Sequence, residues 1–253
     1  MKWQPLADEL ARWSALGKEP RLWLRDDDAI EPTEQLDRLL TKTGEYRIPA
    51  VLAVIPKGAT ESLAERLRGE PRIAVAVHGW AHRNHAPVGE KNQELGAHRP
   101  IERVMDELQQ GLKTLSALFG SQFRPLLVPP WNRIDPSVVV RLPDIGFHAL
   151  STFGHKSLVD EVSGLAQVNS HIDLIDWKGS RGCRDHDALI VEIANELARS
   201  RNGNQTPVGI LTHHLVHDSA VDRFLDGLFT CLEDTDATWL DADTLLNGSG
   251  NTN

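Results

Sequence analysis

The sequence has few cysteines, no long apolar run and a deficit of positive charge. Its two cysteines, Cys183 and Cys231, lie far apart and neither belongs to a CxxC or CxxH pattern, so neither a disulfide framework nor a zinc knuckle is expected. No stretch reaches the roughly 18 to 20 apolar residues that a membrane-spanning helix needs. The 27 lysines and arginines against 36 aspartates and glutamates give a formal charge of -9. Nucleic acids and anionic membranes are therefore not expected partners, because phosphate contacts need clustered basic residues.

The sequence also lacks a secretion signal and a glycine-rich dinucleotide-binding turn. The start of the chain places apolar side chains at helical spacing between charged ones, which predicts an amphipathic helix and not a secretion signal. These apolar residues are Trp3, Leu6, Leu10, Trp13 and Leu16. We therefore expect a soluble, cytoplasmic protein. No G-x-G-x-x-G turn follows the first predicted strand, so an open doubly wound sheet is the weaker alternative for the fold.

A chain of 253 residues fits one large α/β domain better than two small ones. We assign residues 1–246 to this single domain. The short, polar, glycine-containing stretch 247–253 is expected to be a disordered tail. The sequence does not indicate an oligomeric state.

Apolar segments of strand length alternate with amphipathic segments of helix length along the chain. Strands are predicted at 21–25, 49–55, 73–77, 123–128, 147–152, 167–174, 207–212 and 237–240. Helices are predicted at 33–44, 61–68, 101–119, 136–142, 185–200 and 221–232. Seven or eight such units, with connections too long for hairpins, predict a parallel sheet rolled into a barrel. The active site of such a barrel lies at the C-terminal ends of its strands.

Three histidines follow the predicted strand at 73–77. His78 and His82 are four residues apart, a spacing at which two imidazole rings can bind one ion, and His85 is close by as a third ring. The segment 85–100 has no periodicity and is predicted to be a long loop beside them. The alternative is that these histidines occupy a loop by chance, so the interpretation depends on where the other strands end.

Other predicted strands also end in chemically active residues. Asp26, Asp27 and Asp28 follow the strand at 21–25, although such a triplet is also typical of a solvated turn. The remaining strand ends carry an aromatic wall, two acids with a tryptophan, and a histidine, namely Pro129–Trp131, Asp173, Asp176, Trp177 and His213. Residues placed at random would not gather at one rim, so we expect a single shared site.

Two histidines and one carboxylate form a set of three ligands that leaves positions open for water and substrate. We expect this set to bind one divalent metal ion, namely zinc. A neighbouring acid could then take a proton from the attacking water, and a histidine from a distant strand could protonate the leaving group. This combination is typical of the hydrolysis of an amide or an ester.

These residues resemble the motifs of a known family, the polysaccharide deacetylases of the NodB-homology group (carbohydrate esterase family 4). In LRDDDA, the resemblance implies that Asp27 is the catalytic base and Asp28 a metal ligand. In HGWAH, it implies that His78 and His82 are the other metal ligands, with Gly79 in place of the family's serine or threonine. The family also implies a distorted (β/α)7-8 barrel.

Three further motifs complete the resemblance, which extends over residues 22–246. VPPWN is similar to the motif that forms one wall of the substrate groove, so Pro130 and Trp131 are implied to contact the substrate. DLIDW is similar to the motif that would place Asp176 and Trp177 there. LTH is similar to the motif whose histidine donates a proton, which is His213 here.

Two departures from the family pattern concern the catalytic aspartate. The arginine that braces it in the family falls at Val128, so the brace is either lost or supplied by Arg25, Arg124 or Arg133. Asp26 also stands where the family usually has phenylalanine.

The expected function is removal of an acyl group from an N-acylated sugar or a related soluble amide, with a small molecule or an oligosaccharide as the partner. A non-catalytic carbohydrate-binding protein on the same fold is the main alternative. A phosphoesterase is less attractive because few basic residues are assigned to the site. His214 is the alternative to His213 as proton donor, since neighbouring side chains in a strand point to opposite faces and only one can enter the barrel mouth.

Overall fold

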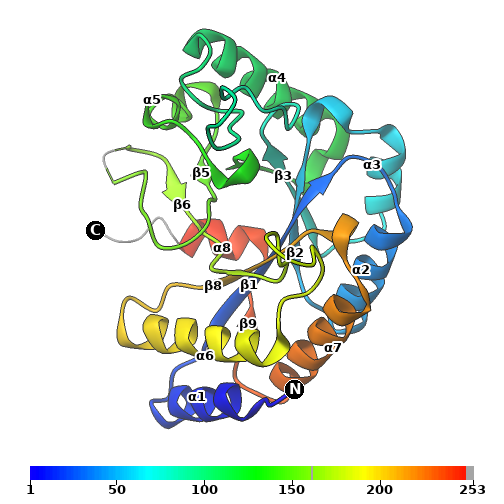
Figure 1. Ribbon diagram of the computed structural model, residues 1–253, viewed down its shortest axis with the longest axis vertical. Helices are drawn as coiled ribbons and strands as arrows, with labels where there is room; N and C mark the ends of the chain where they lie inside the picture. Colours follow the sequence, from blue (N-terminus) through cyan, green and yellow to red (C-terminus); the bar gives the residue numbers. More distant parts are fainter. Residues whose placement is uncertain (161, 249–253) are drawn as a thin grey trace.

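Parallel strands form the centre of the protein, seen here as a computed structural model that describes residues 1–160 and 162–248 (Figure 1). The strands are β1 (Arg21–Ala29), β2 (Ala50–Val54), β3 (Ile73–His78), β4 (Phe123–Val128), β5 (Ala149–Leu150), β6 (Ala166–Gln167), β7 (Ile172–Asp173), β8 (Val208–Thr212) and β9 (Thr238–Trp239). Their order is β6-β5-β4-β3-β2-β1-β8-β7, with β9 beside the start of β1. The predicted distorted (β/α) barrel is therefore confirmed.

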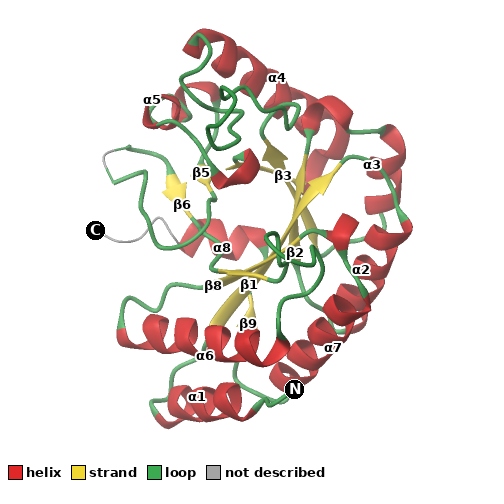
Figure 2. Ribbon diagram, in the orientation of Figure 1, coloured by secondary structure: helices red, strands yellow, loops and turns green. Residues whose placement is uncertain are grey.

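Helices surround the curved sheet (Figure 2). They are α1 (Gln4–Ala15), α2 (Glu34–Glu45), α3 (Glu61–Leu67), α4 (Ile101–Phe119), α5 (Pro136–Val139), α6 (His186–Asn202), α7 (Ser219–Glu233) and α8 (Ala242–Gly248). Thr33 caps the start of α2, because its hydroxyl accepts a hydrogen bond from the Leu36 N–H. In the described part of the chain, no helix has both the length and the apolar character needed to cross a membrane.

Side chains alternate between the two faces of the barrel wall. Alanines, valines, one leucine and one tryptophan pack together in the interior, namely Trp23, Val51, Ala53, Ala74, Ala76, Leu126, Val128, Ala149 and Val168. Larger residues such as Leu52 and Val75 belong to the main core between the sheet and the helices. Gly209 of β8 leaves room for Trp23, because a Cβ at position 209 would lie 2.5 Å from the indole nitrogen.

The barrel is closed by the segment 166–173, for which one continuous strand over 167–174 was expected. Its first part bonds to the β5 side, where the Val168 N–H donates to the Leu150 carbonyl and the Ser170 N–H to the Thr152 carbonyl. The next residue, His171, donates instead to the Gly209 carbonyl of β8. The prediction of a single strand is wrong because the chain changes partners here, which leaves β6 and β7 as two short pieces.

Helix α8 closes the N-terminal end of the barrel and was not predicted. Ala242 and Leu245 pack with Trp23 in the interior cluster. Asn247 and Gly248, the first two residues of the expected disordered tail, form the end of this helix, and 249–253 lie outside the described residues.

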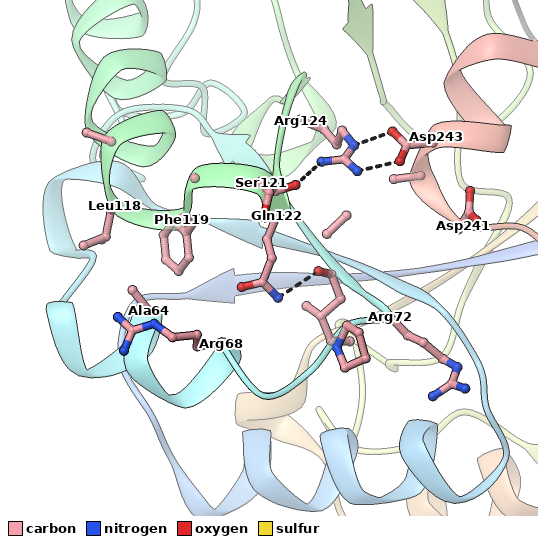
Figure 3. Close-up of a pocket in the computed structure, with 16 residues that line it drawn as sticks. Ala64, Arg68, Arg72, Leu118, Phe119, Ser121, Gln122, Arg124, Asp241 and Asp243 are labelled. Carbon is pink, nitrogen blue, oxygen red and sulfur yellow. Dashed lines mark hydrogen bonds and ion pairs between the residues drawn. The ribbon is translucent and has the colours of Figure 1, made fainter.

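A pocket of about 600 Å³ lies at this N-terminal end, beside α8 (Figure 3). The Arg124 guanidinium crosses it to Asp243 of α8, with the two nitrogen–oxygen distances both 2.5 Å. The pocket opens where β3 and β4 begin, so it lies far along the barrel from the strand ends that carry the candidate catalytic residues. We therefore do not regard it as the active site.

His171, in the closing segment, is partly buried and should make the stability of the protein depend on pH. Burial lowers its pKa from 6.5 to about 4, with His155 and Arg199 contributing, and its Nδ1 accepts the Gly209 N–H. The folded pKa is below the unfolded one, so its stabilising contribution is present above about pH 6.5 and is lost as the pH falls toward about 4. At about 1.4 kcal/mol per pKa unit, the loss reaches at most about 3 kcal/mol.

Urea unfolding at pH 7 and at pH 4 measures this loss. His171→Gln keeps an acceptor for Gly209 but cannot titrate, so its free energy of unfolding should fall less than that of the wild type. The matched control is His148→Gln, because His148 is exposed and lies just before β5. This variant should behave like the wild type. Equal losses in all three proteins would contradict the role of His171.

Candidate active site

Three consecutive aspartates of β1 point in different directions. They were expected to follow the strand, but β1 continues through them to Ala29, so that expectation is wrong. The strand continues because Asp26 and Asp27 are both buried and paired, and not solvated as in a turn. At Asp28 the backbone takes a positive φ of 76°, and the pairing of β1 with β2 shifts in register between Asp26 and Ala29. This bulge turns the Asp28 carboxylate toward β3.

Asp28, His78 and His82 form a group whose ligand atoms all lie within 4.8 Å of one another, and it is the one such group found among the described residues. The Nε2 atoms of His78 and His82 lie 3.1 Å and 3.3 Å from Oδ1 of Asp28. The other ring nitrogen of His78, Nδ1, lies 2.9 Å from the Val128 carbonyl oxygen. A proton on Nδ1 leaves the Nε2 lone pair free for a cation, as is usual for metal-binding histidines.

The charges of this group suit a divalent cation. Burial opposes ionisation of Asp28, but the hydrogen bond and charge of His78 and the charge of His82 hold its pKa well below the usual range. Burial and the nearby His78 lower the pKa of His82. Asp28 is therefore anionic and His82 neutral at pH 7, which are the forms that bind metal. Burial alone would lower the pKa of His78, but its hydrogen bond to Asp28 and the charges of Asp27 and Asp28 raise it, so at His78 a cation competes with a proton. His85, considered as a third ring, is not a member of the group.

Arg25 braces Asp27 inside the barrel. Nε of Arg25 lies 3.0 Å from Oδ1 of Asp27, and Nη2 donates to Oδ2 over 3.1 Å. The arginine is fully buried and the aspartate is 2% exposed. The same guanidinium donates to Oδ1 of Asn132 and to Oγ of Ser151, both at 2.7 Å. All of these contacts fix the position of the Asp27 carboxylate.

The structure shows which of the three candidate arginines takes the place of the family arginine that Val128 replaces. Arg124 is paired with Asp243 at the opposite end of the barrel, and Arg133 donates to the Asn92 carbonyl. Only Arg25 of these three contacts Asp27. The spacing of two residues along a strand was the available signal, because it places both side chains on the same face.

His213 and His214 lie on opposite sides of the barrel wall. Nε2 of His213 is 4.0 Å from Oδ2 of Asp27, at the mouth of the barrel. His214 is fully buried and binds the Asp26 carboxylate through both its backbone N–H and its Nδ1. Burial alone would lower the pKa of His214, but the charge of Asp26 raises it. Sequence reasoning missed this Asp26–His214 pair, although the replacement of phenylalanine by Asp26 was a signal that it needs a partner.

Aromatic side chains flank the Asp28–His78–His82 group on two sides. The Trp131 ring centroid lies 4.4 Å from that of His82, and Pro130 beside it is buried. Trp177 is 40% exposed, its ring centroid lies 4.7 Å from that of His213 with the two rings nearly perpendicular, and its indole N–H donates to Asp173.

Asp176 lies next to Trp177 in sequence but its carboxylate is engaged by its own loop. Its Oδ1 accepts the Gly179 N–H over 3.0 Å and its Oδ2 accepts the Ser180 N–H over 3.1 Å. The substrate contact predicted for Asp176 stays a prediction, and these bonds show that its carboxylate also shapes the loop that carries Trp177.

Removal of either proposed metal-binding ring should abolish tight metal binding. We expect His78→Ala and His82→Ala to weaken zinc binding strongly, whereas His85→Ala should bind like the wild type. Protons compete with the cation for the imidazole nitrogens, so the affinity of the wild type should fall as the pH is lowered below 7. Isothermal titration of chelator-stripped protein with zinc at several pH values measures this. Wild-type affinity in both His78→Ala and His82→Ala would contradict the assignment.

Comparison with solved structures agrees with this fold. No protein-family model and no curated protein matches the sequence. A protein of Mycobacterium smegmatis described as a polysaccharide deacetylase superposes with a TM-score of 0.64 at 16% identity, covering 92% of this chain and 91% of that one. The Bc1960 peptidoglycan N-acetylglucosamine deacetylase gives 0.58 at 17% identity, over 90% and 88%. The chain therefore has the fold of the family 4 carbohydrate esterases and polysaccharide deacetylases.

This fold also occurs without native activity. A mutant of BA3943, a family 4 pseudoenzyme whose activity was restored, matches with a TM-score of 0.59 at 18% identity, covering 90% of this chain and 68% of that one. The fold alone therefore does not decide between an enzyme and an inactive relative, and the side chains at the barrel mouth must carry that argument.

Proposed function

We propose that the protein is a metal-dependent deacetylase that removes an acyl group from an N-acylated sugar or a related amide. The observation that carries the proposal is the 4.0 Å approach of His213 to the braced Asp27, beside the Asp28–His78–His82 group. A base, an acid and a set of cation ligands thus meet at one barrel mouth. This is the arrangement that hydrolysis of an unreactive amide needs.

Each residue has a distinct role in the proposed reaction. Asp28, His78 and His82 would hold a divalent ion, for which we propose zinc, and the bound ion would polarise the acyl carbonyl and make the attacking water more acidic. Asp27 takes the proton from that water, while Arg25 holds both carboxylate oxygens in place. His213 donates a proton to the leaving nitrogen, and Trp177 limits the tilt of its ring.

The flanking aromatics support a carbohydrate as the substrate. Indole faces pack well against the apolar faces of sugar rings, and Trp131 and Trp177 stand next to a metal ligand and the proposed acid respectively. Pro130 and the left-handed backbone of Trp131 give the wall a rigid base. We propose that these tryptophans bind the sugar while its N-acyl group reaches the metal ligands.

The alternative is a carbohydrate-binding protein without turnover, and the BA3943 comparison makes it worth testing. The presence of Asp27, of Arg25 as its brace and of His213 argues for the enzyme. Zinc-loaded protein should release acetate from a panel of N-acetylated sugars, and chelation should stop the release until zinc is restored. Binding of the same sugars without acetate release, on every member of the panel, would favour the binding protein.

A further inference from the structure

A buried carboxylate outside the proposed catalytic set lies beneath the loop that carries His82. Glu94 belongs to the long loop between β3 and α4, yet it is only 1% exposed. It pairs with none of the basic side chains in the described ion pairs; instead its oxygens accept backbone N–H groups of the turn after His78. The donors are Trp80 at 3.1 Å, Ala81 at 2.9 Å and Arg83 at 3.3 Å.

These bonds surround His82, whose own backbone is in an unfavourable conformation. His82 has a φ of 51°, in the left-handed region that non-glycine residues seldom adopt. Such a conformation persists only when neighbouring contacts hold it. Glu94 binds the N–H groups on both sides of this residue, at Ala81 and Arg83, so it fixes the turn that points the imidazole at Asp28.

Gly79 leaves the space that the Glu94 carboxylate occupies. A Cβ at position 79 would lie 2.1 Å from Oε2 of Glu94 and 2.6 Å from Cγ of Pro130, and the φ of Gly79 is 60°. The serine or threonine that the resembled motif carries at this position would have no room here. The Glu94 carboxylate fills the space and binds the turn in its place.

Glu94 is itself held by the segment that carries the aromatic wall. The Asp135 N–H donates to the Leu95 carbonyl over 2.8 Å, and Arg133 donates to the Asn92 carbonyl over 2.8 Å. Trp131 starts the same segment and packs on the His82 ring. His82 is thus supported through its backbone by Glu94 and through its ring by Trp131.

We propose that Glu94 is a positioning residue for metal binding, acting through the turn 80–83 on His82. This inference rests on the proposed metal site. It predicts that the metal affinity depends on Glu94 although Glu94 is not a ligand. Partners one step removed from a metal typically change its affinity by about 10- to 100-fold.

The test is zinc affinity, measured by competition with a chromophoric chelator on the chelator-stripped full chain. Glu94→Gln keeps the size of the side chain but turns one acceptor into a donor facing N–H groups, so its Kd should rise about 10-fold or more. Glu90→Gln on the same loop, where Glu90 is exposed, should leave the Kd unchanged. Thermal melting without zinc separates a local effect from unfolding, because Glu94→Gln should still melt cooperatively.

A second pair of variants tests the close approach of Gly79 and Glu94 without changing Glu94 itself. Gly79→Ala should weaken zinc binding because its methyl group displaces Glu94. Gly89→Ala is the matched control, since Gly89 also has a positive φ, of 94°, but open space around its Cβ position. The absorption spectrum of the cobalt-substituted protein should change in Glu94→Gln and Gly79→Ala and stay as in the wild type in both controls.

The outcomes distinguish this inference from the proposed function. If the wild type binds zinc and both Glu94→Gln and Gly79→Ala bind it equally well with unchanged cobalt spectra, Glu94 has no positioning role and the metal site stands. If the wild type itself binds no divalent metal, the proposed function fails and takes this inference with it. Weaker binding in the two variants with normal controls supports the role of Glu94.

Discussion

Asp27→Asn and His213→Ala should each lower turnover of an N-acetylated sugar by about a hundred- to ten-thousand-fold, because each removes a positioned proton-transfer group. Neither residue is a ligand in the Asp28–His78–His82 group, so both variants should retain zinc. Acetate release and zinc content, measured on the same preparations, test this. A fall in turnover that only accompanies loss of zinc would show that the residues act through metal binding instead.

His214→Ala is the comparison that identifies the acid. His214 faces away from the barrel mouth and its loss leaves Asp26 buried without its partner, so the variant should lose stability while its folded fraction keeps turning over. If His214→Ala loses turnover at normal stability while His213→Ala keeps it, the proton donor is His214.

Arg25→Met should reduce the free energy of unfolding by about 3–5 kcal/mol, because it leaves the Asp27 carboxylate buried without its counter-charge. Urea unfolding at pH 7 measures the loss. The double variant Arg25→Met/Asp27→Asn should recover part of it, since the uncompensated charge is removed as well. Recovery would show that the cost comes from the pairing and not from the lost packing of the arginine stem.

Arg124→Met is the matched control for this experiment. Arg124 also contacts both carboxylate oxygens of an aspartate, but Asp243 is 62% exposed and can be hydrated when its partner is removed. Exposed pairs contribute about 0–1 kcal/mol, so this variant should unfold almost like the wild type. Equal losses in Arg25→Met and Arg124→Met would contradict the special role of the buried brace.

The strand-and-helix pattern was predictable because burial repeats with a fixed period. The bounds of β4 and α4 agree with the prediction, and α4 in particular is long and has buried residues at helical spacing. The gathering of Asp28, His78 and His82 at one end of the barrel was also predictable, because parallel strands bring their C-terminal ends together.

Contacts between side chains distant in sequence could not be predicted in the same way. Glu94 lies in a loop without periodicity. Nothing in the neighbouring sequence indicates that it is buried or that it binds the turn 80–83. The Asp26–His214 pair joins residues nearly two hundred positions apart on the outer side of the wall. Such pairings depend on which elements become neighbours, and an amphipathic pattern specifies only which face is buried.

The closing segment 166–173 affects how stability is distributed around the barrel. β2 is joined to β3, and β1 to β8, by continuous ladders, and the β1–β2 ladder is interrupted only at the bulge between Asp26 and Ala29, whereas this segment is held to each neighbour by a few bonds. Local opening therefore costs least along this line. Asp27, Asp28 and His78 lie on β1 and β3, which have long pairings with their neighbours, while Trp177 follows β7 at the weaker edge. The proposed metal and base positions can thus stay rigid while the loop that carries Trp177 moves, which would combine a fixed site with an adaptable entrance.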